Sequence, residues 1–271
     1  MSSTVRSRAV ALPGVRRGVD AAREVLLLGV LYVLYRAGRL VATGHEVQAR
    51  ANAGKVHSFE RWLPLPAETD LQRLAADVPH LLQAANVYYV SVHFPVTIAF
   101  LAWGYLRRPR AEYVWARNVL VTVTALALVI EFLFPLAPPR MFPQWGFVDT
   151  MTTIGPSAYD GAGASLANQY AAMPSLHIGW AVTLAVVVHR TGPPLLRVLT
   201  KLHATATVFV VVITANHWWL DGIVVVALLV VAVSVVPGPR TRGPEPRPPE
   251  PPRPPRAPRP PRERRLLRRP A

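Results

Sequence analysis

The sequence predicts an all-α, polytopic membrane protein, a six-transmembrane-helix bundle with a disordered cytoplasmic tail. Hydrophobic residues make up 51% of the 271 positions, yet the formal net charge is +15. The two facts are compatible only if charge is segregated, and residues 237–271 indeed hold 11 of the 30 Lys and Arg residues and 14 of the 28 prolines. Elsewhere, six apolar stretches approach the roughly 20 residues that a helix needs to cross a hydrocarbon layer about 30 Å thick.

These stretches give the predicted spans in chain order. They are 24–42, 84–106, 113–136, 174–190, 197–216 and 218–237. Residues 202–236 form one apolar run that would be roughly 50 Å long as a single helix, too long for one crossing. We expect it to break at its polar cluster, NHWWLDG at 216–222. Arg36 and Arg39 interrupt the first span, whose alternative is a signal sequence, although the charged stretch before it is long for one.

The distribution of Lys and Arg over the connections predicts sidedness. Basic residues gather in the N-terminus, in two turns and in the tail (1–23, 107–117, 190–201 and 237–271). By contrast, 43–80 has four basic against five acidic residues, and 137–173 has Arg140 alone. The positive-inside rule therefore puts both termini in the cytoplasm and these two loops outside the plasma membrane. We expect a basic N-terminus (1–23), a membrane domain (24–236) and a tail (237–271).

The tail is rich in proline and arginine and has little to bury, so it cannot offset its ordering entropy. We expect a polyproline-like, cationic segment that binds anionic lipids of the inner leaflet. The chain has no cysteine, which excludes disulfides, thiolate nucleophiles and cysteine-bound zinc. The sequence contains no acidic cluster that would suggest a metal site. We expect neither a cofactor nor a nucleic-acid partner.

Five chemically capable residues fall at the predicted external ends of spans, although they are far apart in the sequence. They are Arg140, Ser175, His177, His217 and Asp221. The sidedness was assigned from charge alone, so this coincidence predicts a functional site on the outer face.

The stretch AAMPSLHIGW, 171–180, predicts an anion site at a helix start. Pro174 suits the first helical position, which puts Ser175 and His177 in the first turn, where unpaired N–H groups and the helix dipole favour an anion. Ser175 adds a hydroxyl and His177 an acid/base group. The alternative is a plain helix start with an interfacial histidine.

In NHWWLDG, His217 and Asp221 are four residues apart and share a face if this segment is helical. A carboxylate beside an imidazole fixes its tautomer and prepares it as a nucleophile or base. The alternative is an interfacial His and Asp between tryptophan anchors.

Arg140, in FPLAPPR, suggests a phosphate clamp or else a snorkelling arginine. Asn168, Gln169 and Tyr170 come just before the helix start and could bind a head group or cap local structure. His93, Tyr88 and Tyr89 of the second span could line the site or simply pack. An amphipathic pattern at 68–82 predicts a helix on the outer leaflet through Leu71, Leu74, Val78 and Leu82.

PSLH, followed after a further span by H-x-x-x-D, resembles the type 2 phosphatidic acid phosphatase superfamily. The PPR turn, NQYAAMPSLH and NHWWLD resemble its inositol phosphorylceramide synthase-like (inositolphosphotransferase) branch. The resemblance covers roughly residues 85–235. It implies a six-helix membrane core with an active site at the non-cytoplasmic face and a two-step reaction through a phosphohistidine.

By carry-over, the resemblance implies His217 as nucleophile, Asp221 as its orienting partner and His177 as general acid. Ser175 and Arg140 would hold the phosphoryl oxygens. The sequence departs from the phosphatase pattern by lacking the lysine before Arg140. Val211 stands where that pattern has an arginine. The departures leave hydrolysis and head-group transfer both open.

The expected function is thus a lipid phosphate phosphatase or phospholipid head-group phosphotransferase, acting on a lipid phosphate or phospholipid. The alternative is a non-catalytic lipid-binding or scaffolding protein on the same bundle. A transporter is suggested by Glu131 within the third span, but the sequence lacks the paired half-helices of such folds.

Overall fold

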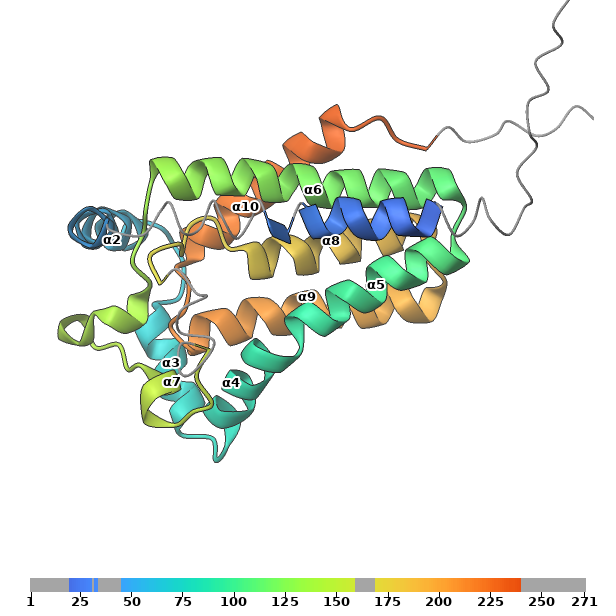
Figure 1. Cartoon of the computed structure of the whole chain (residues 1–271). Helices are drawn as coiled ribbons and strands as arrows, with labels where there is room; N and C mark the ends of the chain where they lie inside the picture. The colour runs from blue at the N-terminus through green and yellow to red at the C-terminus, as the bar shows by residue number, and fades with distance from the viewer. Residues whose placement is uncertain (1–19, 31, 34–44, 159–168, 240–271) are drawn as a thin grey trace, which may run out of the picture. The chain divides into compact units, whose positions relative to one another are not determined.

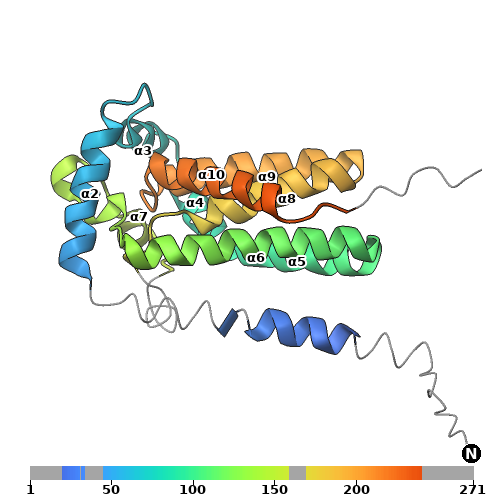
Figure 2. The same ribbon diagram turned by 90° about the horizontal axis from the view of Figure 1, so that it is seen from above.

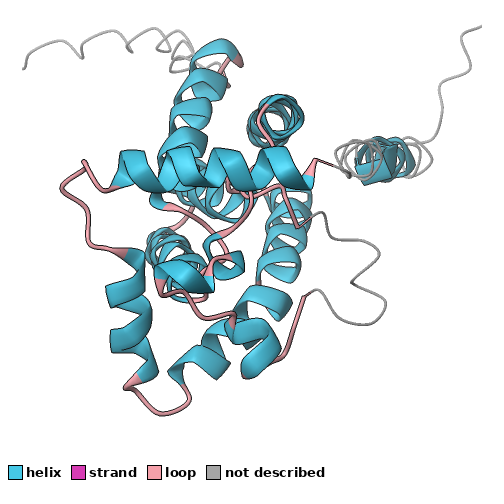
Figure 3. Cartoon of the chain, turned by 90° about the vertical axis from the view of Figure 1, so that its left-hand side faces the viewer, coloured by secondary structure: helices cyan, strands magenta, loops and turns pink. Residues whose placement is uncertain are grey.

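The computed structural model describes residues 20–30, 32–33, 45–158 and 169–239. These residues form helices and loops without a strand (Figure 3). One isolated parallel bridge joins Leu136 to Ala171 among them. The predicted all-α fold is therefore confirmed for the described part of the chain. The tail from residue 240 and much of the first predicted span, 24–42, lie outside it.

Helices occupy the five predicted spans that the structure describes in full, with two helices in 84–106, and three further helices among the described residues lie between the spans. They are α2 Glu46–Glu60, α3 Glu68–Ala76, α4 Leu81–Ser91, α5 His93–Arg107, α6 Arg110–Leu133, α7 Thr150–Thr153, α8 Leu176–Thr191, α9 Pro194–Ile213 and α10 Trp219–Val235, with 3₁₀ turns η1 Pro139–Met141 and η2 Pro143–Trp145. Pro135 and Pro138 follow α6 and prevent its continuation. The apolar run 202–236 breaks at 214–218, between α9 and α10, as its polar cluster predicted.

Among the described residues, α6 and α9 are long and apolar enough to cross a membrane. Helices α4 and α5, bent by 44° at Val92, make a third crossing if they count as one span. Helix α8 has 16 residues and α10 has 17, which corresponds to about 24 and 26 Å at 1.5 Å per residue. The described helices are compatible with a membrane protein, while the six-span arrangement stays a prediction.

Helix α8 lies at the centre of the bundle and packs against α5, α6, α9 and α10 (Figure 1). The main core is built largely from aliphatic residues of four helices: Val119 and Val123 of α6, Leu184, Val187 and Val188 of α8, Val211 and Val212 of α9, and Val225 and Leu229 of α10. Gly179 lets α8 approach α10 closely, because a Cβ there would lie 2.5 Å from Cγ2 of Val225. The bundle thereby fixes the starts of α8 and α10 relative to each other.

Short elements gather at the end of the bundle where α8 and α10 begin, as Figures 1 and 2 both show for α2, α3 and α7. Long-range hydrogen bonds tie this end together. Asn52 Nδ2 donates to Pro135 O at 2.9 Å, and Trp218 Nε1 donates to Ala137 O at 2.9 Å. Gln72 Nε2 donates to Ile213 O at 3.1 Å. The loops are thus held by side chains from α2, α3 and the segment between α9 and α10.

The amphipathic segment predicted at 68–82 is divided between α3 and α4 and is not one helix, and its position on the outer leaflet stays a prediction. Leu74 and Val78 are exposed, whereas Glu68, Gln72 and Ala75 are buried against the rest of the protein. The polar side chains are buried because they find hydrogen-bond partners in the interior, such as the Ile213 carbonyl for Gln72.

Candidate active site

Helix α8 begins at Leu176, two residues later than the predicted start at Pro174. Ser175 is the N-cap and not a first-turn residue, and its Oγ accepts a hydrogen bond from the backbone N–H of Ile178 at 3.3 Å. Pro174 lies before the cap, and His177 is the second residue of α8. The Ser175 N–H donates to the Asp221 carbonyl at 3.2 Å, so the start of α8 is tied directly to α10.

His217 pairs with Asp221 as predicted, but for a different reason. His217 lies in the segment between α9 and α10, not on the helix, so the two do not share a helical face. Asp221 is the N3 residue of α10, and its Oδ2 reaches back to the Trp218 N–H at 2.9 Å and to His217 Nδ1 at 3.2 Å. The pairing therefore comes from capping geometry.

The surroundings of His217 fix its tautomer. Its Nδ1 lies 2.9 Å from the Ala172 carbonyl and 3.2 Å from the Asp221 carboxylate, both of them acceptors. A proton must therefore sit on Nδ1, and Nε2 carries the lone pair. His217 is also 5% exposed, so its position is set by packing as well as by hydrogen bonds. This is the state in which an imidazole attacks an electrophile.

His177 lies near His217 and contacts two other aromatic rings. The centroids of His177 and His217 are 5.7 Å apart. Tyr89 of α4 stacks on His177 at 4.3 Å, and His93 of α5 lies 4.5 Å from it. The break at Val92 brings Tyr89 and His93 to the same imidazole, which sequence reasoning left undecided. Tyr88 instead bonds His203 Nδ1 at 2.6 Å.

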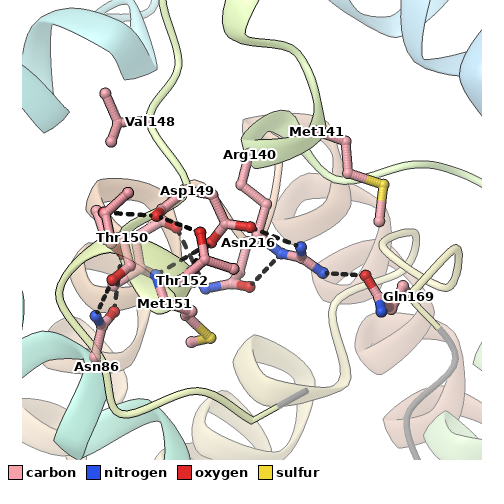
Figure 4. Close-up of polar contacts among 12 residues, drawn as sticks. Asn86, Arg140, Met141, Val148, Asp149, Thr150, Met151, Thr152, Gln169 and Asn216 are labelled. Carbon is pink, nitrogen blue, oxygen red and sulfur yellow. Dashed lines mark hydrogen bonds and ion pairs between the residues drawn. The ribbon is translucent and has the colours of Figure 1, made fainter. Parts of the chain in front are cut away.

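Arg140 is buried in the 3₁₀ turn η1, and Figure 4 shows the polar side chains around its guanidinium. Its Nε donates to Asn216 Oδ1 at 3.2 Å, and its backbone N–H to the Ala215 carbonyl at 2.8 Å. Its Nη1 lies 3.3 Å from Asp149 Oδ2, and its Nη2 3.3 Å from Gln169 Oε1. Asn216 precedes His217 in the chain, so the guanidinium is tied to the segment that carries His217.

The residues predicted to bind a head group make different contacts. Gln169 contacts Arg140, as described above (Figure 4). Tyr170 hydrogen-bonds Glu46 of α2, and burial and this carboxylate raise the pKa of Tyr170. Asn168 lies outside the described residues. Sequence reasoning missed Asp149 and Asn216, which no motif around Arg140 indicates.

Two buried carboxyl groups at the start of α10 were also missed. Glu60 Oε1 accepts a hydrogen bond from the Leu220 N–H at 2.6 Å, and Glu68 Oε1 accepts one from the Trp219 N–H at 3.3 Å. Burial raises the pKa of Glu60 to about 9, helped by the adjacent carboxyl of Glu68 and by Asp221. Glu60 therefore holds a proton at neutral pH.

The described residues contain no group of three or more His, Cys, Asp and Glu side chains that could hold a metal ion. What the site brings together is an oriented imidazole, a second imidazole and a buried guanidinium. Such a set can attack phosphorus, transfer a proton and balance anionic charge.

Comparison with known proteins gives one result. No curated protein and no solved structure matched the chain. Residues 54–235, which include Arg140, His177, His217 and Asp221, match the PAP2 superfamily. This match spans well over half of the sequence, and the chain therefore belongs to the PAP2 superfamily.

Proposed function

We propose that this protein is a membrane lipid-phosphate phosphatase or phospholipid head-group phosphotransferase that works through a phosphohistidine on His217. Membership of the PAP2 superfamily suggests phosphatase or phosphotransferase chemistry. The observation that carries the proposal is the state of His217, whose Nδ1 is held by Ala172 and Asp221 while His177 lies across from its ring.

In the first step, the lone pair on His217 Nε2 forms a bond to phosphorus as the bond from phosphorus to the lipid alcohol breaks. Protonated His177 gives its proton to the departing oxygen. Asp221 stabilises the imidazolium character that develops on His217. Arg140 and Ser175 would hold the phosphoryl oxygens, with Arg140 exchanging contacts now made to Asp149 and Gln169.

In the second step, His177 takes a proton from water or from a lipid hydroxyl, whose oxygen attacks the phosphohistidine. The bond from nitrogen to phosphorus breaks, and His217 returns to its starting state. Water gives a phosphatase, and a lipid hydroxyl gives a head-group transferase of the inositolphosphotransferase kind. Gln169, Tyr170 and Asn168 are the side chains proposed to contact the head group.

The proposed setting is a six-span bundle in the plasma membrane, with the site outside and both termini in the cytoplasm. Its support is the distribution of basic residues, together with the position of the starts of α8 and α10 at one end of the bundle (Figure 1). The tail, 237–271, would contact anionic lipids of the inner leaflet.

The test is incubation of the purified protein with a panel of lipid phosphates and with phosphatidylinositol, using His217→Ala as the control. Release of inorganic phosphate by the wild type indicates a hydrolase, and a new phospholipid indicates a transferase. Absence of turnover on the whole panel, with lipid binding retained, would favour the non-catalytic lipid-binding alternative.

A further inference from the structure

We infer that Glu60 and Glu68 are positioning residues for the His217–Asp221 pair, acting through the hydrogen bonds that they accept from the first turn of α10. The inference rests on the proposed function of that pair. Neither glutamate lies in a motif that predicted the site.

The start of α10 is capped by three carboxyl groups from three helices. Asp221 accepts the Trp218 N–H at 2.9 Å, Glu68 of α3 accepts the Trp219 N–H at 3.3 Å, and Glu60 of α2 accepts the Leu220 N–H at 2.6 Å. Each N–H would otherwise lack an intrahelical partner. A helix start usually receives one such side chain. Here, three consecutive N–H groups are fixed in direction.

All three carboxyl groups are removed from solvent. Glu60 is 7% exposed, Glu68 is 6% exposed and Asp221 is fully buried. Glu60 Oε2 and Asp221 Oδ1 are buried without a hydrogen-bond partner. Three negative charges in one turn would repel each other, so a proton must be retained among them. Burial and the adjacent carboxyl of Glu68 raise the pKa of Glu60, so the Glu60 carboxyl is one place for this proton.

His57, near the C-terminal end of α2, interacts electrostatically with Glu68 and Arg61. His57 stacks on Trp145 at 4.5 Å and lies 5.7 Å from Trp218. The C-terminal part of α2 therefore packs against the NHWWLD segment through aromatic rings as well as through Glu60.

The consequence for His217 follows from the chain connection. Asp221 Oδ2 serves both the Trp218 N–H and His217 Nδ1, so a small rotation of the first turn of α10 changes the direction of the carboxylate relative to the imidazole. Glu60 and Glu68 hold the two N–H groups between these residues. The geometry requires that the side chains of Glu60 and Glu68 be long enough to reach α10 from α2 and α3. It does not require that they carry a charge.

Reach and charge can be separated by two conservative substitutions. Glu60→Gln keeps the length and an acceptor for Leu220 but cannot ionise. Glu60→Asp keeps the carboxyl but is one methylene shorter and cannot reach. Asp70→Asn is the matched control, because Asp70 is an exposed carboxylate on α3 paired with Arg73.

The variants would be compared as purified full-length protein by two measurements. The first is kcat and KM with dioctanoyl phosphatidic acid. The second is the downfield Nδ1–H proton signal of His217 in the NMR spectrum, assigned by its loss in His217→Gln. Thermal unfolding gives the folded fraction.

We expect Glu60→Gln to keep kcat within about threefold and to keep the downfield signal. Glu60→Asp should lose kcat by about 10²-fold at unchanged KM, the usual effect of a displacement near 1 Å, and its signal should broaden or vanish. Asp70→Asn should match the wild type in both.

Three results would overturn the inference: an active Glu60→Asp with an impaired Glu60→Gln, wild-type behaviour of both, or equal losses in both after correction for folded fraction. If wild type turns over no lipid phosphate, the proposed function fails, whereas the His217 signal still decides the role of Glu60.

Discussion

Replacing Gly179 by alanine tests whether the close approach of α8 and α10 holds the proposed catalytic groups together. The new Cβ would lie 2.5 Å from Val225 Cγ2 and 3.5 Å from Val123 Cγ1. Carbon atoms pack best about 3.5–4.0 Å apart, so α8 and α10 must separate by about 1 Å. Overpacking of this kind costs about 1–3 kcal/mol of stability. Because His177 is on α8 and Asp221 on α10, a shift near 1 Å should also lower turnover by about 10²-fold.

Thermal unfolding and turnover of a lipid phosphate measure the two effects. Val225→Ala alone should destabilise by about 2 kcal/mol because it leaves a cavity, whereas the double variant with Gly179→Ala should recover much of both losses. Gly54→Ala is the control, since no atom lies within 4 Å of its new Cβ. Wild-type behaviour of Gly179→Ala, or strictly additive losses in the double variant, would refute the reasoning.

Four further predictions follow from the site and the charge distribution. His217→Ala should abolish turnover without unfolding, and a phosphohistidine should be trapped in the wild type; turnover within tenfold of wild type would contradict this. His177→Ala should slow a poor leaving group by roughly 10²–10⁴-fold and an activated ester much less, so equal losses would exclude proton donation. On intact cells, a cysteine at Thr153 should react with an impermeant thiol reagent, whereas a cysteine at Ala257 should not. Labelling of position 257 alone would show that the topology is the reverse of the one proposed. Since the pKa of Glu60 is raised from 4.5 to about 9, folded protein retains a proton that the unfolded chain releases, so stability should fall as pH rises through this window. Glu60→Gln should flatten that fall in thermal unfolding, and an unchanged slope would count against the shift.

The parts of the site that the sequence predicted are those whose cause is local. A helix had to begin near Ser175, and the apolar run had to break near His217, because spacing and length alone dictate both. The pairing of His217 with Asp221 was also predicted correctly, but through a shared helix face. Four-residue spacing is compatible with a helix face and with a cap, and only the actual start of α10 distinguishes them.

The parts that the sequence could not predict depend on residues brought together from distant segments. Asp149 and Asn216 contact Arg140 across 9 and 76 positions of the chain. The burial of Glu68 in α3 could not be predicted, because its partner, the Trp219 N–H, is 151 positions away. Periodicity shows that a short helix is amphipathic, but it does not show which face will find partners.

The shortness of α8 and α10 has a consequence for the surrounding lipid. Embedded in a bilayer, these helices would fall about 5 Å short of the hydrocarbon thickness. Such a mismatch is relieved by local thinning of the leaflets at modest cost. In the proposed topology, the opposite ends would be anchored at the inner surface near basic residues such as Arg190 and Arg197, and the shortfall in length would lie at the starts of α8 and α10. The outer leaflet would dip there, and a phosphate would reach His217 while its acyl chains stay among their neighbours.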